Sequence, residues 1–340
     1  MSLPQTMRAI AIAEPGGPDA LRGVELARPV PGPDDILIRV AAAGVNGPDL
    51  AQRRGRYDPP PGASPLPGLE VAGIVAARGA NVESLAPGQR VMALANGGGY
   101  AEYVAVPAGQ ALPVPRGWTL AEAAALPETW FTVIQTLVMR AGLAGGMHVL
   151  VHGASGGIGG AAIQICAIAG ARAIAVVSSP EKAAYCRQLG AVATIERTRE
   201  DLVERVMALT GDKGADRVVD LLGGATAPIN IALSARRGHI VQIATLESAT
   251  ASLSLRAMMA KELTLSGSTL RPQDAATKAA IAARFARDFL PALGRPDWIR
   301  PKIERFALDD AAAAHRRMES RSHTGKMVLV TAFGAHPDGS

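Results

Sequence analysis

A run of glycines between residues 153 and 160 is the part of the sequence best suited to hold a ligand with its backbone. Gly153, Gly156 and Gly159 follow an apolar stretch at 149–151 and precede a helical pattern at 158–169. Glycines allow a tight turn and a close approach of the main chain, and a helix N-terminus offers unpaired N–H groups. The run therefore predicts a dinucleotide pyrophosphate site. Its residues would be Gly153, Ala154, Ser155, Gly156, Gly157 and Ile158.

Two registers of the motif are possible. In the common G-x-G-x-x-G spacing the first glycine is replaced by Ala154, whereas a G-x-x-G-x-x-G spacing begins at Gly153. A tight turn that binds nothing is the simpler alternative. The strand before the run and the helix and strand after it favour a nucleotide site, because a dinucleotide motif requires that context.

The residues after the second strand of this region bear on the choice of cofactor. A site for NAD places a carboxylate there to bind the ribose 2′-hydroxyl. Here the strand ends in Ser178 and Ser179, Lys182 follows, and Arg197 comes after the next short strand. Hydroxyls and cations would bind a 2′-phosphate that a carboxylate would repel. We therefore expect NADPH, the alternative being that Lys182 and Arg197 are solvated surface charges.

The elements that position these residues follow from the apolar pattern. Between residues 126 and 267, apolar runs at 149–151, 173–177, 217–221 and 239–243 alternate with helical patterns at 158–169, 180–189 and 199–209. Continuously apolar strands that alternate with helices predict a parallel sheet covered on both faces. Before them lie short strands at 36–40, 71–75 and 103–106, separated by Gly and Pro, which predict an irregular β-rich barrel. A helix at 274–290 and a strand at 326–330 close the chain.

Composition limits the class of protein. The 340 residues are 48% hydrophobic and 19% charged, with a net charge of +5, which is typical of a folded protein of two domains. Cys166 and Cys186 are too few for a disulfide framework and are expected to be buried packing groups. Because no signal peptide and no apolar run of about 18 residues is present, we expect a cytoplasmic protein that does not enter a membrane.

The segment 44–50 resembles a motif of the medium-chain dehydrogenase/reductase superfamily. The zinc alcohol dehydrogenases of that superfamily have a cysteine zinc ligand where this chain has Asn46, and a histidine ligand where it has Leu69 before Glu70. No cluster of four cysteines for a structural zinc is present either. Zinc requires nitrogen or sulfur ligands at definite spacing, so we expect no metal.

Further segments are similar to zinc-free NADPH:quinone oxidoreductases, and the tyrosine before Asp-Pro-Pro-Pro-Gly looks most like their tumour-suppressor-inducible branch. The segments are 52–62, 97–104, 123–130, 220–224 and 325–326. The resemblance implies an α/β fold: a GroES-like domain from residues 1–125, completed by a return segment at 268–340, and a Rossmann domain at 126–267, with the active site at the junction of the two domains. It also implies a homodimer in which the segment 263–267 could pair across the interface.

The resemblance assigns roles to single residues. Asn46 and Tyr57 would lie beside the nicotinamide and the acceptor and would donate hydrogen bonds to the acceptor oxygen, while Thr132 would contact the nicotinamide end of the cofactor. Ser178, Ser179 and Lys182 would hold the 2′-phosphate, and Arg197 replaces a tyrosine of many relatives. Less closely matched loops place four more residues near the nicotinamide: Ile243, Ala244, Ser268 and Leu270.

The expected reaction is transfer of a hydride from NADPH to a quinone, with water as the proton source, because no general acid stands out in the sequence. One alternative is an enoyl or alkenal reductase that acts on α,β-unsaturated carbonyl compounds. Another is a nucleotide-loaded RNA-binding protein with little catalysis, although no basic stripe interleaved with aromatic residues indicates nucleic acid. We expect His152 to be structural, His315 and His323 to lie on the surface, and Glu70 to make a structural hydrogen bond.

Overall fold

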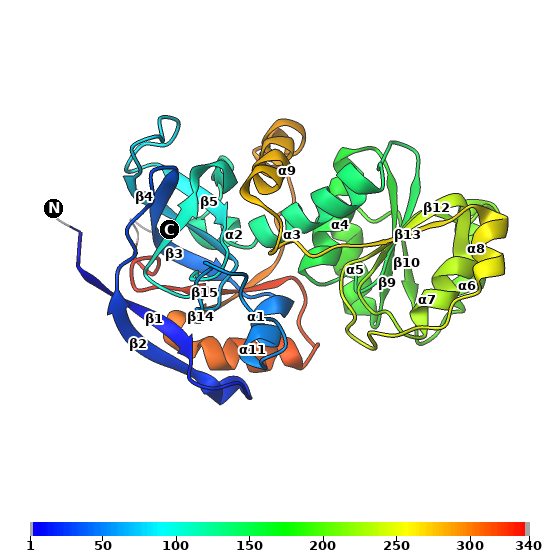
Figure 1. The fold of residues 1–340 in the computed structure, drawn as a ribbon. Coiled ribbons are helices and arrows are strands. Elements are labelled where there is room, and N and C mark those ends of the chain that lie inside the picture. The colour runs from blue at the N-terminus through cyan, green and yellow to red at the C-terminus, as the bar shows by residue number, and fades with distance from the viewer. Residues whose placement is uncertain (1–2, 337–340) are drawn as a thin grey trace. The chain divides into compact units, whose positions relative to one another are not determined.

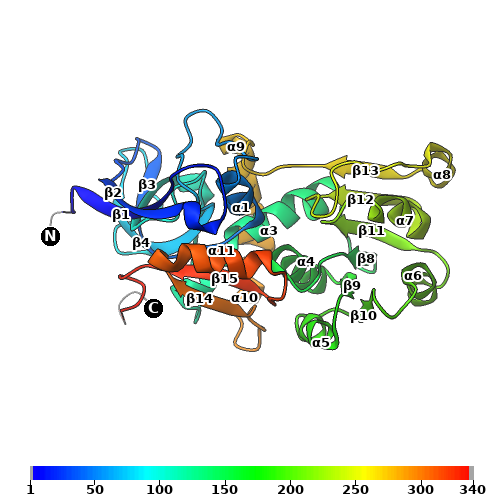
Figure 2. The same cartoon turned by 90° about the horizontal axis from the view of Figure 1, so that it is seen from below.

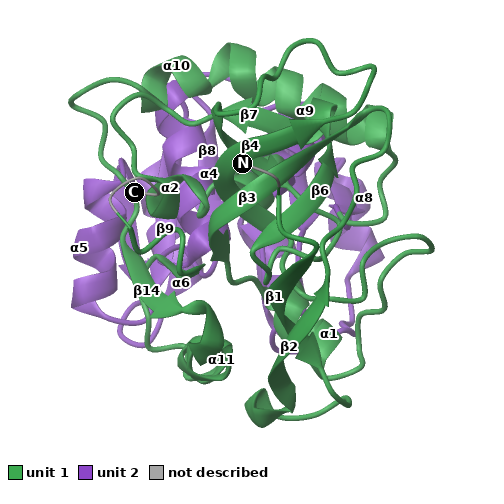
Figure 3. Ribbon diagram, turned by 90° about the vertical axis from the view of Figure 1, so that its left-hand side faces the viewer, with its two compact units in different colours: residues 1–131, 271–340 green, residues 132–270 purple. Residues whose placement is uncertain are grey.

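The computed structural model describes residues 3–336 and divides them into two compact units (Figure 3). Unit 1 comprises the residues up to Phe131 and those from Arg271 onward, and unit 2 comprises Thr132–Leu270. The family resemblance implies a first domain in two segments, with boundaries at 125/126 and 267/268. The chain passes from unit 1 to unit 2 within one helix, α3 (Pro127–Val133).

Unit 1 is built on a mostly antiparallel sheet. Its strand order is β14 (Ile303–Ala307), β15 (Lys326–Val330), β3 (Asp35–Gly44), β4 (Glu70–Arg78), β5 (Arg90–Leu94) and β7 (Ala111–Pro113), and β6 (Tyr103–Pro107) also pairs with β3. A hairpin of β1 (Thr6–Ile12) and β2 (Leu21–Ala27) forms a second sheet. Strand β15, far along the chain, hydrogen-bonds to β3, so the C-terminal segment completes the first sheet.

Short helices connect and cover these strands. They are η1 (Pro18–Ala20), α1 (Gly47–Arg53), η2 (Ala108–Gln110), α2 (Leu120–Ala123), α3, α9 (Ala275–Asp288), α10 (Leu290–Leu293), η4 (Leu308–Asp310) and α11 (Ala311–Glu319). Trp130 of α3 stacks on Phe285 of α9 with ring centroids 5.0 Å apart. Aliphatic side chains form most of the core.

Unit 2 is built on a single sheet with helices around it (Figure 1). The sheet has six strands, all pairings are parallel, and the order is β10, β9, β8, β11, β12, β13. The strands are β8 (His148–Val151), β9 (Arg172–Val177), β10 (Ala193–Glu196), β11 (Ala215–Asp220), β12 (Ser234–Gln242) and β13 (Thr264–Gly267). The helices are η3 (Ile134–Arg140), α4 (Gly157–Ile168), α5 (Pro180–Gln188), α6 (Leu202–Thr210), α7 (Thr226–Leu233) and α8 (Leu255–Lys261).

Helices cover both faces of this sheet, as parallel strands require. Figure 2 shows α4 and α5 on one face and α6 and α7 on the other. The predicted helix at 199–209 begins three residues later than expected, because the Asp201 side chain accepts a hydrogen bond from the Glu204 N–H and so caps the helix. The predicted α/β class, a β-rich domain plus a Rossmann-like parallel sheet, is confirmed.

Two smaller predictions can be compared with the structure. Cys166 and Cys186 are both buried free thiols, and burial raises the pKa of each to about 12, so both remain uncharged packing groups. No helix among the residues 3–336 is long and apolar enough to span a bilayer.

Candidate functional site

The carboxyl ends of the parallel strands bring the predicted cofactor residues of unit 2 to one edge of the sheet. The glycine loop follows β8, Ser178 and Ser179 follow β9, Arg197 follows β10, and Ile243 follows β12. Because neighbouring strands run in the same direction, these loops lie side by side. The parallel register of β12 and β13, with Gln242 opposite Gly267, puts Ser268 beside Ile243.

The conformation of the glycine loop depends on two of its three spaced glycines, Gly153 and Gly159. Gly153 has a φ of +59°, which a residue with a side chain rarely adopts. A Cβ at Gly159 would overlap the backbone of Ala154, so glycine allows α4 to pack against the loop. At Gly156, however, a Cβ would meet only the Gly153 carbonyl at 3.5 Å. Protein packing therefore does not demand a glycine at position 156, whereas a close ligand would.

The residues predicted to bind the adenosine end lie close to one another. The N–H of Arg197 donates to the Val177 carbonyl at 3.1 Å, and the Lys182 ammonium donates to the Ser178 hydroxyl at 3.4 Å. Ser179 caps α5 by accepting from the Lys182 N–H. The Arg197 guanidinium pairs with Glu247 at 3.2 Å, a contact that the sequence pattern does not predict. This exposed ion pair offsets part of the charge of Arg197.

The remaining predicted cofactor residues differ in how firmly they are held. The Ile243 N–H donates to the Asp220 carbonyl at 2.9 Å, and the Ala244 carbonyl accepts from the Gln242 side chain at 2.6 Å. The Ser268 hydroxyl is buried without a hydrogen-bond partner among the described residues. Thr132 and Leu270, both buried, are the first and last residues of unit 2. An orphaned hydroxyl at Ser268 is what a missing ligand partner would leave.

A buried hydrogen-bond network joins the carboxyl ends of β8 and β11 through residues His152, Asn230 and Asp220. His152 Nε2 lies 2.8 Å from the Asn230 side-chain oxygen, and the Asn230 amide donates to Asp220 at 2.9 Å. Asp220 in turn accepts from the N–H groups of Leu222 and Gly223. Burial lowers the pKa of His152, so its ring is neutral and donates from Nε2 to Asn230. His152 is 1% exposed and therefore serves as a structural residue, as expected.

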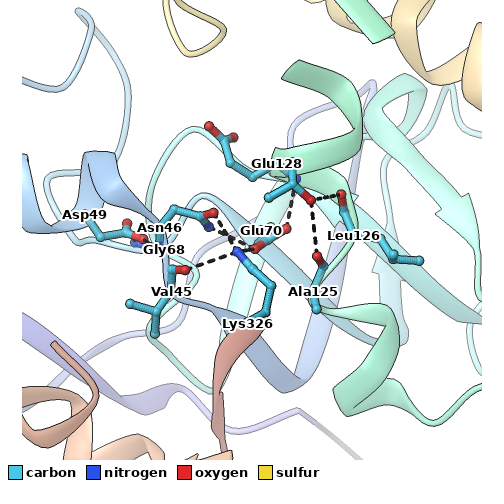
Figure 4. Close-up of polar contacts among 10 residues, drawn as sticks. Val45, Asn46, Asp49, Gly68, Glu70, Ala125, Leu126, Glu128 and Lys326 are labelled. Atoms are coloured by element: carbon cyan, nitrogen blue, oxygen red, sulfur yellow. Dashed lines mark hydrogen bonds and ion pairs between the residues drawn. The ribbon is translucent and has the colours of Figure 1, made fainter. Parts of the chain in front are cut away.

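In unit 1, Asn46 belongs to a buried polar cluster with Glu70 and Lys326 (Figure 4). The Lys326 ammonium donates to the Asn46 side-chain oxygen at 2.6 Å, to the Val45 carbonyl at 3.1 Å and to Glu70 Oε1 at 2.5 Å. The Asn46 amide nitrogen donates to the same Glu70 oxygen at 2.9 Å. Since ammonium only donates and carboxylate only accepts, the amide cannot flip. One Asn46 N–H remains available for a ligand.

Asp49 anchors the backbone around this cluster. Its carboxylate accepts from the N–H groups of Asn46 and Gly68, each at 2.8 Å. Burial is the main cause that raises the pKa of Asp49 to about 6. Gly68 has a φ of +102°, and a Cβ there would collide with the backbone of Gly99 and Tyr100. The Asp49 carboxylate thus connects the loop that contains Asn46 to the loop that contains Gly68.

The expectation that His315 lies on the surface is wrong. His315 is 0% exposed, because α11 packs against β15 and its ring is enclosed between Tyr100 and Arg53. Arg53 donates to Nδ1 and the Tyr100 hydroxyl lies 3.1 Å from Nε2, so the proton of the neutral ring is on Nε2. Burial lowers the pKa of His315 to about 3. His323, by contrast, is partly exposed.

Tyr57 lies in a second group of polar residues in unit 1. The Arg271 guanidinium lies 5.7 Å from the centre of its ring, and the Tyr57 hydroxyl has no hydrogen bond to any described residue. Burial raises the pKa of Tyr57, and the charge of Glu128 raises it further, so the phenol keeps its proton. A protonated hydroxyl without an internal partner is free to donate to a ligand.

The sequence does not identify several members of these groups. Lys326 appears there only as part of a family-like dipeptide, and Glu128 and Arg271 carry no signal of their own. Their partners lie far away in the chain, as in the 256-residue separation of Lys326 and Glu70. Glu70 does make the structural hydrogen bonds expected of it, to Asn46 and to the N–H of Glu128.

Comparison with known proteins gives matches along the chain. Residues 32–116 match the alcohol dehydrogenase GroES-like domain, and residues 157–284 match a domain described as zinc-binding dehydrogenase. A human quinone oxidoreductase is 30% identical over 328 residues, which are 95% of this chain and 98% of that protein. A quinone oxidoreductase of Pseudomonas aeruginosa is 34% identical over 95% of this chain and 99% of its own length.

Solved structures agree with these matches. The Escherichia coli quinone oxidoreductase complexed with NADPH has a TM-score of 0.80 and 27% identity, and the alignment covers 96% of this chain and 99% of that one. An NAD-dependent alcohol dehydrogenase has a TM-score of 0.84 and 30% identity over 95% and 99% of the two chains. The CurK enoyl reductase has a TM-score of 0.82 and 25% identity over 96% and 100%.

Proposed function

Because the chain belongs to the quinone oxidoreductase family of the medium-chain dehydrogenase/reductase superfamily, we propose that it reduces quinones with NADPH, without zinc. It is an oxidoreductase that uses a nicotinamide cofactor and acts on a small molecule. The proposal concerns which nicotinamide cofactor, which acceptor and which residues. The observation that carries it is the glycine loop at the carboxyl end of β8, beside the Ser178, Ser179 and Lys182 group.

The residues of unit 2 fit a dinucleotide. Gly153 and Gly159 shape the loop, and the open space at Gly156 admits a pyrophosphate against the N–H groups of α4. The orphaned Ser268 hydroxyl supplies a further polar contact. When bound, the cofactor would supply a hydride. The protein's part is to hold it and to orient the acceptor.

The preference for the 2′-phosphate rests on the group that follows β9. Two hydroxyls and the Lys182 ammonium lie together there, with Arg197 next to them on the neighbouring strand. Both cations are partly exposed and can reorient toward a phosphate. Glu247 weakens the contribution of Arg197, so Lys182 and the serines should matter more. The structure of a similar protein with NADPH is consistent with this choice.

Independence from zinc is proposed from the donor set. Asn46 and Leu69 stand where zinc-dependent relatives carry ligands, and neither an amide paired on both sides nor an aliphatic side chain suits zinc. The positive charge beside Asn46 comes from Lys326, whose three donors are all in use. No group of three His, Cys, Asp or Glu suited to a metal occurs in the part of the chain that the structure describes.

Asn46 and Tyr57 would stabilise the negative charge that develops on the acceptor oxygen. The Asn46 amide offers one unused N–H in a fixed orientation, and the Tyr57 hydroxyl is protonated and has no internal partner. Preorganised donors of this kind are effective because they need not reorient during the reaction.

The test is oxidation of NADPH and of NADH, followed at saturating benzoquinones and naphthoquinones. We expect turnover with NADPH preferred, and we expect Lys182→Ala with Arg197→Ala to remove most of that preference while leaving turnover with NADH unchanged. Arg172→Ala with Lys213→Ala is the matched control, because both residues are exposed and Arg172 begins β9 at the opposite end of the sheet. A wild-type protein that prefers NADH would contradict the cofactor assignment.

The similarity to an enoyl reductase structure supports a second acceptor class, α,β-unsaturated carbonyl compounds. The same assay with enones and enoyl thioesters separates the two. A kcat/KM at least tenfold higher for enones would replace quinones as the principal acceptor. If no acceptor is reduced although NADPH binds, the reductase proposal fails and the nucleotide-loaded RNA-binding alternative becomes the one to pursue.

A further inference from the structure

Glu128 is a buried carboxyl group whose position in unit 1 the proposed reaction does not explain. It lies in the first turn of α3, and its N–H donates to Glu70 Oε2 at 2.9 Å. In Figure 4 no dashed line joins the Glu128 carboxyl group to Asn46, Glu70 or Lys326. The N–H of Glu128 is thus bonded to the Asn46 cluster, while its carboxyl group takes no part in the hydrogen bonds of that cluster.

The Glu128 carboxyl group has no hydrogen bond and no ion pair with any residue between 3 and 336. The two other buried acids nearby differ, since Asp49 accepts from two N–H groups and Glu70 accepts from Asn46, Lys326 and Glu128. Glu128 is 7% exposed, yet its oxygens are not among the fully buried polar atoms that lack a partner. They therefore keep a small area of exposed surface.

Six charged or titratable groups lie close enough to this carboxyl group to interact with it electrostatically: Asp49, Tyr57, Glu70, Arg271, Lys278 and Lys326. Burial is the main cause that raises the pKa of Glu128 to about 8, and the charges of Glu70 and Asp49 raise it as well. Lys326 and Lys278 lower it in part. Near neutral pH the group therefore keeps a proton that it can transfer.

Of the three cations that face Glu128, Lys326 is paired with Glu70, and neither Lys278 nor Arg271 forms an ion pair with Glu128 among the described residues. The Lys278 ammonium donates to the Asn96 side chain at 2.6 Å and to the Arg271 carbonyl at 2.7 Å. The Arg271 guanidinium donates to Gln52 at 2.7 Å and to the Asn96 carbonyl at 3.0 Å. Both cations are held by neutral acceptors, so pairing with them does not account for Glu128.

We propose that Glu128 is the proton donor of the reduction, in place of water; this inference rests on the proposed function. The acceptor gains two electrons and one hydrogen as a hydride from the nicotinamide. The second hydrogen leaves the Glu128 carboxyl group as a proton and forms the O–H bond at the acceptor oxygen that has become negative. The resulting carboxylate then regains a proton from water. Tyr57, in electrostatic contact with Glu128, orients that oxygen by its hydroxyl.

The test compares Glu128→Gln, which keeps the shape and loses the transferable proton, with the wild-type protein. General acid catalysis contributes roughly 10²- to 10⁴-fold, so we expect kcat to fall at least about 100-fold. The loss should be larger with enones than with quinones, because an enolate oxygen is the more basic. The dissociation constant of NADPH should not change, which also shows that the variant is folded.

The pH dependence gives a second readout. The wild-type kcat should fall as the pH rises through about 8, where Glu128 loses its proton, and this limb should be absent in Glu128→Gln. Infrared spectra of the wild-type protein at pH 7 should show a protonated carboxyl band that disappears in the variant. Glu122→Gln is the matched control, since Glu122 lies in the first turn of α2 and its carboxylate is occupied by Thr119 and Arg300.

The outcomes separate the two proposals. An active wild-type protein whose kcat and alkaline limb survive in Glu128→Gln overturns the role of Glu128 and leaves the quinone reductase proposal standing. A wild-type spectrum without a protonated carboxyl band at pH 7 overturns it as well, even if the variant does not fold. A wild-type protein that reduces no acceptor overturns the proposed function and this inference together.

Discussion

At the scale of single residues, the Asn46 cluster shows how a buried charge can fix the direction of an uncharged donor. Lys326 and Glu70 each contact a different end of the Asn46 amide, and both are almost fully buried. Glycine is required at position 44, because a Cβ there would overlap the Glu70 carboxylate. The amide is therefore oriented by one ion pair instead of by its own local backbone.

Removing Lys326 should destabilise the protein strongly. Lys326→Met leaves the Glu70 carboxylate, which is 0% exposed, without a counter-ion, and such a change costs about 3 to 5 kcal/mol. The free energy of unfolding in urea measures this loss. Adding Glu70→Gln to Lys326→Met removes the stranded charge and should recover much of it. A Lys326→Met variant within 1 kcal/mol of wild type would contradict the ion-pair argument.

The sequence predicts Asn46 and Tyr57 as site residues from their family positions, and it also singles out Glu70. It does not predict that Lys326 orients Asn46 or that His315 is buried. Both facts depend on packing between residues separated by more than 200 positions, as in the contact of Arg53 with His315. Periodicity and spacing describe only neighbours along the chain, so they carry no signal for such contacts.

At the scale of elements, substitutions of two glycines at the start of α4 should distinguish an effect on protein packing from an effect on NADPH binding. Gly159→Ala places a methyl group against the Ala154 backbone, so we expect a loss of about 1 to 3 kcal/mol in unfolding free energy together with weaker NADPH binding. The methyl group of Gly156→Ala meets only the Gly153 carbonyl, in ordinary van der Waals contact at 3.5 Å, so this variant should weaken NADPH binding without loss of stability. Calorimetric titration and urea unfolding measure the two effects. Equal stability losses in both variants would refute the distinction.

The contact between α11 and α1 should depend on pH. The pKa of His315 is about 3 in the folded protein and near 6.5 when unfolded, so protons bind preferentially to the unfolded chain. The stability that His315 contributes is present above pH 6.5 and is lost as the pH falls toward 3. The wild-type advantage in unfolding free energy over His315→Gln should shrink between pH 7 and pH 4. The exposed His336 provides a control, since His336→Gln should show no such trend.

The strands and helices of unit 2 can be predicted from the sequence, because continuous apolar runs mark its strands and helical apolar patterns mark its helices. Predicted strands at 149–151 and 173–177 correspond to β8 and β9 within one residue at each end. The elements of unit 1 follow less well. The hairpin of β1 and β2 and the strand β14 have mixed polarity and half-exposed side chains, so no clean alternation marks them.

At the scale of the whole molecule, the proposed homodimer can be tested at β13. This strand is the edge of the sheet in unit 2, and Leu265 on it is 41% exposed. An exposed edge pairs readily with a second strand. We expect sedimentation velocity to show a dimer for the wild-type chain and a monomer for Ser266→Pro, which removes a backbone donor from the edge. A Ser266→Pro variant that stays dimeric would place the interface elsewhere.

The completion of the first sheet by β15 has a consequence for biosynthesis. Glu70 leaves the ribosome 256 residues before Lys326. At a translation rate of about 5–20 residues per second, the Glu70 carboxylate is synthesised roughly 13 to 50 s before the Lys326 ammonium that pairs with it. Unit 2, which is continuous in the chain, is fully synthesised within that interval. The synthesis of unit 2 is therefore complete before that of unit 1, and the N-terminal sheet lacks two of its strands, β14 and β15, until the last part of the chain emerges.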